Sequence, residues 1–213
     1  MKDSDIQRLA DRIRGTLPGF TAQLRMAPRP RPGWYPGEIP EDSREGAGLV
    51  VLYPVRGELH VILTVRHGDL PQHAGQVSLP GGAREPDEDL TTAALREGEE
   101  EVGLDPRSLQ VLGHLSPLHI PASGFVLHPV VAQVEDRPAL HPADGEVERI
   151  LEVSLGDLRD PARIQVERRF LKDRHYDVPY FDLHGEKVWG ATAMVLAELL
   201  WLLGTPPDPW GPD

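Results

Sequence analysis

Cysteine is missing from this sequence of 213 residues. Without it, the chain cannot form disulfides, thiolate nucleophiles or cysteine-ligated zinc sites. Long apolar runs are missing too, and no stretch approaches the roughly 20 residues that a membrane-spanning helix needs. The N-terminal stretch 1–17 is charged and amphipathic, which does not fit a secretory signal peptide. We therefore expect a cytoplasmic protein that has no contact with membranes.

Basic residues are scarce relative to acidic ones. The chain has 22 Lys and Arg against 34 Asp and Glu, for a net charge of −12. Non-specific nucleic-acid binding depends on an excess of basic side chains, so this composition argues against a nucleic-acid partner. A small anionic substrate stays compatible with the composition, provided that a metal ion or a local basic cluster neutralises it.

The length suits one substantial domain with appendages. Proline and glycine crowd residues 27–46, a composition that predicts an irregular connector rather than a second domain. We divide the chain into an N-terminal helix with its connector (1–45), a main domain (46–204) and a proline-rich tail (205–213).

Strand-like runs outnumber helical ones along the main domain. A first helix is expected to begin at Ser4 as its cap. The mid-chain helix is expected at 89–102 and the closing one at 190–203. The strands are expected at 47–55, 58–66, 109–120, 125–135, the start of 148–158, 163–171, 175–183 and 186–190. This pattern predicts a mixed sheet sandwiched by helices, an α/β or α+β fold class.

The mid-chain helix carries an unusual acidic cluster at its C-terminal end. Glu97, Glu100 and Glu101 have the spacing i, i+3, i+4, which places them within about a 100° arc beside the apolar face. Like charges at this spacing repel, and the negative end of the helix dipole adds to the cost. The cluster is either a solvated acidic face or a site that holds a divalent cation.

The surrounding run "GGAREPDEDLTTAALREGEEEVGL" (81–104) favours the cation site. From Gly82 onward it resembles the signature box of the Nudix hydrolases, with one departure, because Gly98 occupies an apolar position of that box. The matching residues are Gly82, Glu88, Arg96, Glu97, Glu100, Glu101, Gly103 and Leu104.

The resemblance implies a Nudix-type α/β/α sandwich with a mixed sheet and a metal-binding loop-helix-loop. It also implies that Glu97, Glu100 and Glu101 bind Mg²⁺ or Mn²⁺ and form the catalytic set together with Arg96. Glu88 and Gly82 would orient this set. The implied reaction is water attack on the diphosphate of a nucleoside diphosphate derivative, with a carboxylate accepting the proton. Glu146 is a candidate for that proton acceptor, although a solvated loop glutamate explains it as well.

The stretch "ILTVRHGDLPQHAGQVSLPGG" (62–82) resembles the additional signature of the coenzyme A pyrophosphatases within the Nudix family. The chain departs from that signature at His67, Pro71 and Leu79. The resemblance extends over residues 45–203, and the matches in this stretch are Leu63, Thr64, Arg66, Gly75, Pro80, Gly81 and Gly82.

This second resemblance implies hydrolysis of coenzyme A or its thioesters, giving 3′,5′-ADP and 4′-phosphopantetheine or its acyl form. Arg66 and Gly81 would contact the substrate, whereas a salt bridge at a strand end is an equally good account of Arg66. Two other readings stay open at this point. One is a Nudix pyrophosphatase for ADP-ribose, NADH or another nucleotide, and the other is a non-catalytic nucleotide-sensing module. The apolar segment 190–203 either packs in the core or joins a homodimer.

Overall fold

The computed structural model describes residues 2–30, 39–40, 43–68, 75–121, 123–171 and 174–211. The helices are α1 (Lys2–Ile13), α2 (Phe20–Gln23), α3 (Leu90–Val102), α4 (Leu155–Arg159) and α5 (Gly190–Leu202). The strands are β1 (Arg44–Val55), β2 (Glu58–Arg66), β3 (Val77–Ser78), β4 (Gly81–Ala83), β5 (Gln110–His114), β6 (Leu118–Ile120), β7 (Phe125–Gln133), β8 (Val147–Ser154), β9 (Ile164–Leu171), β10 (Arg174–Leu183) and β11 (Glu186–Trp189).

The main sheet is mixed. Its central strand β1 pairs with β2 in an antiparallel sense and with β7 in a parallel sense. The path runs β3-β2-β1-β7-β5, while β4, β6 and β8 pair with β1, β7 and β2 respectively. A separate three-stranded sheet has the order β11-β10-β9. The predicted mixed sheet is therefore confirmed.

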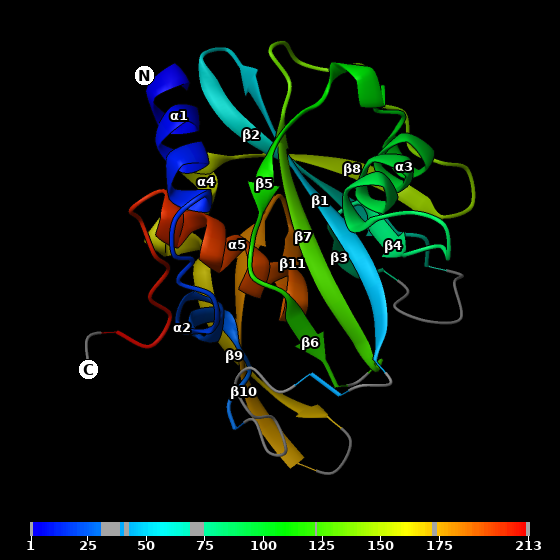
Figure 1. Ribbon diagram of the computed structural model, residues 1–213. Helices are drawn as coiled ribbons and strands as arrows, with labels where there is room; N and C mark the ends of the chain where they lie inside the picture. Colours follow the sequence, from blue (N-terminus) through cyan, green and yellow to red (C-terminus); the bar gives the residue numbers. More distant parts are fainter. Residues whose placement is uncertain are drawn as a thin grey trace.

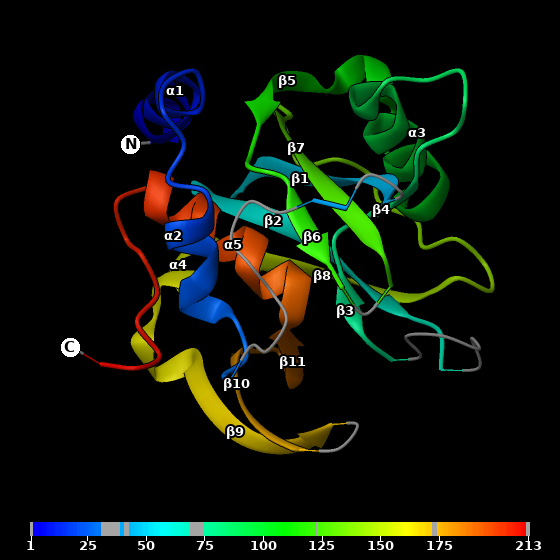
Figure 2. The same cartoon turned by 60° about the horizontal axis from the view of Figure 1, so that its bottom comes forward.

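Helices cover both faces of the main sheet, as Figures 1 and 2 show. On one face, α3 packs on alternate residues of β1, and these side chains form a compact apolar cluster with Ala93, Ala94 and Val102. On the other face, α5 packs in a larger cluster that also includes Leu9 and Ile13 of α1. The strands bury both faces, and the predicted α/β/α sandwich is confirmed.

The closing helix is an internal element. Every residue of α5 from Thr192 to Leu200 is buried within this single chain. Of the two expectations for this segment, packing in the core is therefore the one observed. Within the described part of the chain, no helix combines the length and the apolar character needed to cross a membrane.

Two local expectations were wrong. Helix α1 begins at Lys2, so Ser4 lies inside the helix and not at its N-terminus. The strand expected at 109–120 is interrupted between β5 and β6, where Pro117 lacks an N–H for a sheet hydrogen bond. The short strand β4, which pairs with β1, was not among the expected strands.

Candidate active site

The glycine-rich strand β4 lies between β1 and the acidic helix α3. It pairs with β1 through Gly82 opposite Ala47 and Gly81 opposite Gly48. Helix α3 begins after Asp89, whose side chain accepts a 2.7 Å hydrogen bond from the Thr92 N–H. The helix ends at Gly103, which has the left-handed conformation typical of a helix C-terminus. These local signals place the acidic end of α3 beside β4.

Glycine is needed at position 82 because of the neighbouring glutamate. A Cβ atom on Gly82 would lie 2.4 Å from Oε1 of Glu97. At Gly98, a Cβ would lie 2.6 Å from Cδ2 of Leu49, so the helix approaches the sheet closely at this position too. Because Gly82 and Gly98 have no side chain, α3 can pack against the sheet and the Glu97 side chain can lie over β4.

Glu101 is the most enclosed carboxylate of the cluster, with its side chain 4% exposed. Burial raises its pKa to about 7, and the nearby charge of Glu97 acts in the same direction. The Gly81 N–H donates a hydrogen bond of 3.3 Å to Oε2 of Glu101. Arg66 lies on the other side, with Nη1 3.8 Å from Oε1 of Glu101. Two predicted substrate-contacting residues thus meet one predicted metal ligand.

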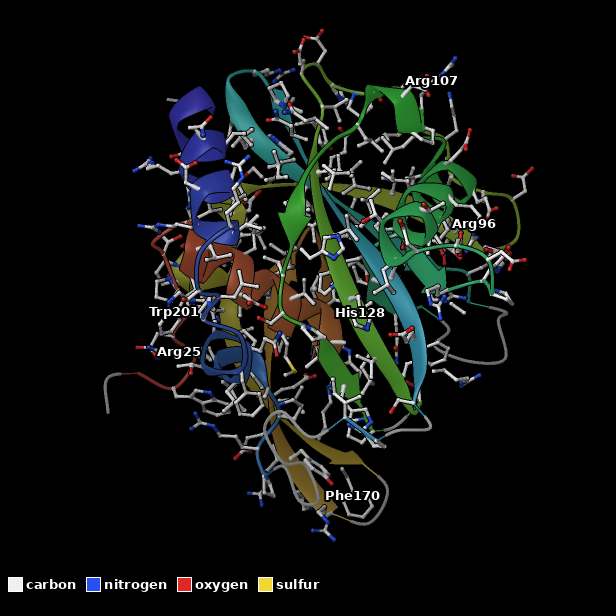
Figure 3. The ribbon with its side chains drawn as sticks, viewed as in Figure 1. Arg25, Arg96, Arg107, His128, Phe170 and Trp201 are labelled. Atoms are coloured by element: carbon white, nitrogen blue, oxygen red, sulfur yellow. The ribbon has the colours of Figure 1, made fainter. Side chains whose placement is uncertain are left out.

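A single arginine organises the rest of the cluster, and Figure 3 shows it on α3. Arg96 lies 3.0 Å from Glu88, 2.9 Å from Glu97 and 2.8 Å from Glu100. Its hydrogen bonds hold the pKa of Glu88 below the usual range. Burial raises the pKa of Glu97 in spite of the adjacent guanidinium. Arg96 therefore contacts Glu88, Glu97 and Glu100 at once.

The expected convergence of three carboxylates is only partly met. Glu101 is buried and Glu97 is partly buried, but the Glu100 side chain is 58% exposed and turned toward Arg96. Among the residues that the structure describes, no three His, Asp or Glu side chains are grouped so that they could hold a metal ion. The helical spacing places the three glutamates on one side of α3. The ion pair with Arg96 sets the direction in which the Glu100 side chain points.

The loop before β8 reaches the same site. Ala143 donates its N–H to the Glu101 carbonyl at 2.9 Å, and His67 donates its N–H to the Glu146 carbonyl at 2.9 Å. The charge of Glu146 contributes to raising the pKa of both Glu97 and Glu101. The structure thus brings Glu146 into the neighbourhood of the cluster. Pro71 and His73 lie outside the described residues.

The sequence did not predict a further set of hydrogen bonds, which connects β1 to the loop before α3. Arg84 donates from Nε to Oε2 of Glu45 and from Nη1 to the Glu88 carbonyl, both at 3.0 Å. Arg96 donates to the neighbouring Ala83 carbonyl at 3.2 Å. No pattern in the sequence signals this pairing, since Arg84 and Glu45 are far apart along the chain.

Gly82→Ala is expected to lower turnover by about 10- to 100-fold, the range seen when a residue that orients a metal ligand is changed. The new Cβ displaces the carboxylate of Glu97, which is the mobile end of a side chain, so the fold survives. Steady-state kinetics and thermal unfolding measure the two effects. The matched control is Gly68→Ala, where a Cβ meets no atom within 4 Å. Equal activity of the two variants would contradict the placement of Glu97.

The mixed sheet, the acidic helix and the glycine-rich strand together form a carboxylate-lined site at one face of the sheet. The model of the NUDIX domain family matches residues 42–174. The chain therefore belongs to the Nudix family and is a hydrolase that acts on nucleoside diphosphate derivatives. Nudix hydrolases generally use divalent metal ions.

Relatives and a solved structure agree with this assignment. A Pectobacterium atrosepticum protein described as uncharacterized Nudix hydrolase NudL is 35% identical over 83% of this chain and 88% of its own length. Nudix hydrolase 15, mitochondrial, of Arabidopsis thaliana is 40% identical over 66% of this chain and 51% of its own length. The crystal structure of a MutT/nudix family protein from Enterococcus faecalis is 18% identical, covering 78% of this chain and 70% of that one, with a TM-score of 0.50. This last likeness concerns the fold.

Proposed function

We propose that this Nudix hydrolase cleaves the diphosphate linkage of coenzyme A or its thioesters. The products are 3′,5′-ADP and 4′-phosphopantetheine or its acyl form. One observation carries the proposal: Arg66 and Gly81, which belong to the substrate signature at 62–82, both contact Glu101 of the acidic helix. The segment that resembles a coenzyme A signature and the segment that resembles a metal site therefore belong to one site.

Glu97, Glu100 and Glu101 are proposed to hold Mg²⁺ or Mn²⁺. Carboxylate oxygens suit such hard cations, and a cation would offset the burial and, secondarily, the repulsion that raise the pKa of Glu97 and Glu101. Glu100 would complete the set by turning away from Arg96. A divalent ion supplies charge neutralisation of the diphosphate and a more acidic water.

The chain's own residues have separate tasks in this proposal. The Nε atom of Arg66 is buried and has no hydrogen-bond partner in the described structure, which leaves a donor for a phosphate oxygen. Arg96 and Glu88 keep Glu97 in place through their ion pairs. Glu146 is the proposed acceptor of the proton from the attacking water, because it is close enough for its charge to contribute to the raised pKa of Glu101.

A substrate panel tests the proposal. With Mg²⁺ or Mn²⁺ present, kcat/KM for coenzyme A is expected to exceed that for ADP-ribose and NADH by at least about tenfold, which corresponds to about 1.4 kcal/mol of transition-state binding. Mass spectrometry of the products should show 3′,5′-ADP together with 4′-phosphopantetheine. Coenzyme A turned over no faster than ADP-ribose or NADH would defeat the substrate assignment and leave the hydrolase assignment untouched.

A second candidate is a pyrophosphatase for ADP-ribose, NADH or a related nucleotide. The specific observation in its favour is the sequence at 71, where proline replaces the arginine of the coenzyme A signature and removes one possible phosphate contact. The same panel separates the two candidates, and AMP is then the expected product in place of 3′,5′-ADP.

A further inference from the structure

The three-stranded sheet ends in a strand whose outer edge has no neighbour in the described structure. Strand β9 pairs with β10 alone, in a register that sets Arg168 opposite Asp177 and Val166 opposite Pro179. Figure 1 shows the β9–β10 hairpin projecting beyond the rest of the molecule. A long free edge offers a row of backbone N–H and C=O groups to another strand, and proteins usually cover or blunt such an edge.

One face of this edge also carries two exposed apolar side chains. Val166 is 39% exposed and Phe170 is 64% exposed, the largest exposed fraction among the exposed large apolar side chains of the described residues. Both share their face with Phe181, which is fully buried farther along the same sheet. Figure 3 places Phe170 at the projecting end of the hairpin. The core-facing surface of this sheet thus continues beyond the part that its own chain covers.

We propose that the partner of β9 is the β9 strand of a second copy of this chain, paired antiparallel about a two-fold axis at Arg168. This register sets Val166 opposite the partner's Phe170, twice by symmetry. It also sets Glu167 opposite the partner's Arg169. Cross-strand apolar pairs and opposite charges are the contacts that stabilise an antiparallel pair.

A two-fold axis at either neighbouring residue would give less favourable cross-strand pairs. An axis at Glu167 sets that carboxylate against its own copy and Val166 against an arginine. An axis at Arg169 sets Glu167 against Leu171 and Phe170 against an arginine. With the axis at Arg168, the one like-charged pair is Arg168 with its own copy. In each chain Asp177 of β10 lies opposite Arg168 and offsets that charge.

Charge also favours this edge over other surfaces for self-association. The chain has a net charge of −12, so two copies repel one another over most of their surface. Strand β9 carries Arg168 and Arg169 against Glu167, and is therefore locally positive. Arg96 of the candidate active site lies well away from Phe170 in Figure 3, so pairing at this edge leaves the acidic cluster open.

The cysteine-free sequence allows a direct test of the register. Opposite residues in an antiparallel pair have Cα atoms about 4.5–5.5 Å apart, within the span of a disulfide. Arg168→Cys is expected to give a covalent dimer on mild oxidation, seen on a non-reducing gel. Val166→Cys alone should not form a covalent dimer. In this register its two copies are offset by four residues along the strand, which is about 13 Å. A mixture of Val166→Cys and Phe170→Cys should cross-link again.

Sedimentation of the unmodified chain gives an independent readout. A dimer is expected at micromolar concentration, and Phe170→Glu should convert it to a monomer that keeps the circular dichroism spectrum of the native fold. The control is Val111→Glu, at another exposed valine that is 37% exposed on β5, which should remain dimeric. A monomeric native chain overturns the proposal. So does a dimer that survives Phe170→Glu, or a chain in which Val166→Cys cross-links to itself and Arg168→Cys does not.

Discussion

Glu101→Gln is expected to lower kcat by roughly 10²- to 10³-fold while the protein stays folded, the scale on which a single preorganised electrostatic group acts. The substitution keeps the shape of the side chain and an oxygen for the Gly81 N–H, but it removes the most enclosed negative charge of the cluster. Steady-state kinetics over a range of Mg²⁺ and Mn²⁺ concentrations measure the effect. The metal concentration for half-maximal rate should rise as well.

The same variant is expected to be more stable than the native chain when both are metal-free. Because the pKa of Glu101 is raised to about 7, its ionisation disfavours the fold. That cost is zero near pH 4, grows as the pH rises toward 7, and is constant above it. The gain in Tm from Glu101→Gln should therefore be largest at pH 8 and vanish near pH 4 in differential scanning fluorimetry.

Glu99→Gln is the matched control for both measurements. Glu99 lies on the same helix with an exposed side chain, and the substitution is chemically identical. It should leave turnover and Tm nearly unchanged. Native turnover in a folded Glu101→Gln variant would mean that Glu101 does not bind a metal ion, and the proposed site would have to be abandoned.

Glu198→Ala is expected to destabilise the protein by about 3 kcal/mol or more, because each buried donor left without an acceptor costs about 1–3 kcal/mol. Glu198 is fully buried in α5. It accepts hydrogen bonds from the Gly19 N–H at 3.1 Å, from Gln23 Nε2 at 3.0 Å and from Ser116 Oγ at 2.7 Å. The carboxylate thereby ties the N-terminal segment and the β5–β6 loop to the closing helix.

Urea denaturation measures the free energy of unfolding for this variant. Alanine favours helix formation, so a loss of stability cannot arise from helix propensity. Glu198→Gln should lose less stability than Glu198→Ala, because the amide keeps one oxygen acceptor. It should still lose some stability, because the amide N–H groups face other donors. Glu99→Ala, the same change at an exposed helical site, should be nearly neutral. A change below about 0.5 kcal/mol in Glu198→Ala, the range of ordinary surface substitutions, would refute the structural role of the network.

The acidic helix was predictable because its signals are local. Asp89 caps it, Gly103 ends it, and the glutamate spacing places Glu97 and Glu101 beside the buried face. Pro117 marks the interruption between β5 and β6, but the group that binds the chain there was not predictable from local pattern. There the Ser116 N–H bonds to Glu198, a residue from the far end of the chain, instead of continuing the strand. A distant partner overrides strand propensity at such a position.

Most of the strand positions along the chain follow from alternation and turn chemistry, yet the meeting of Arg66 with Glu101 does not. It requires β2, β4 and α3 to assemble around β1, and only packing of their apolar faces sets that geometry.

The sequence alone determined that a carboxylate-rich helix of fixed length follows a glycine-rich segment, because helix caps and residue spacing act over a few residues. The tertiary structure decided which carboxylates are buried, which one Arg96 draws outward, and where a free strand edge remains. Those outcomes depend on desolvation and on charges that are brought together only when distant segments pack.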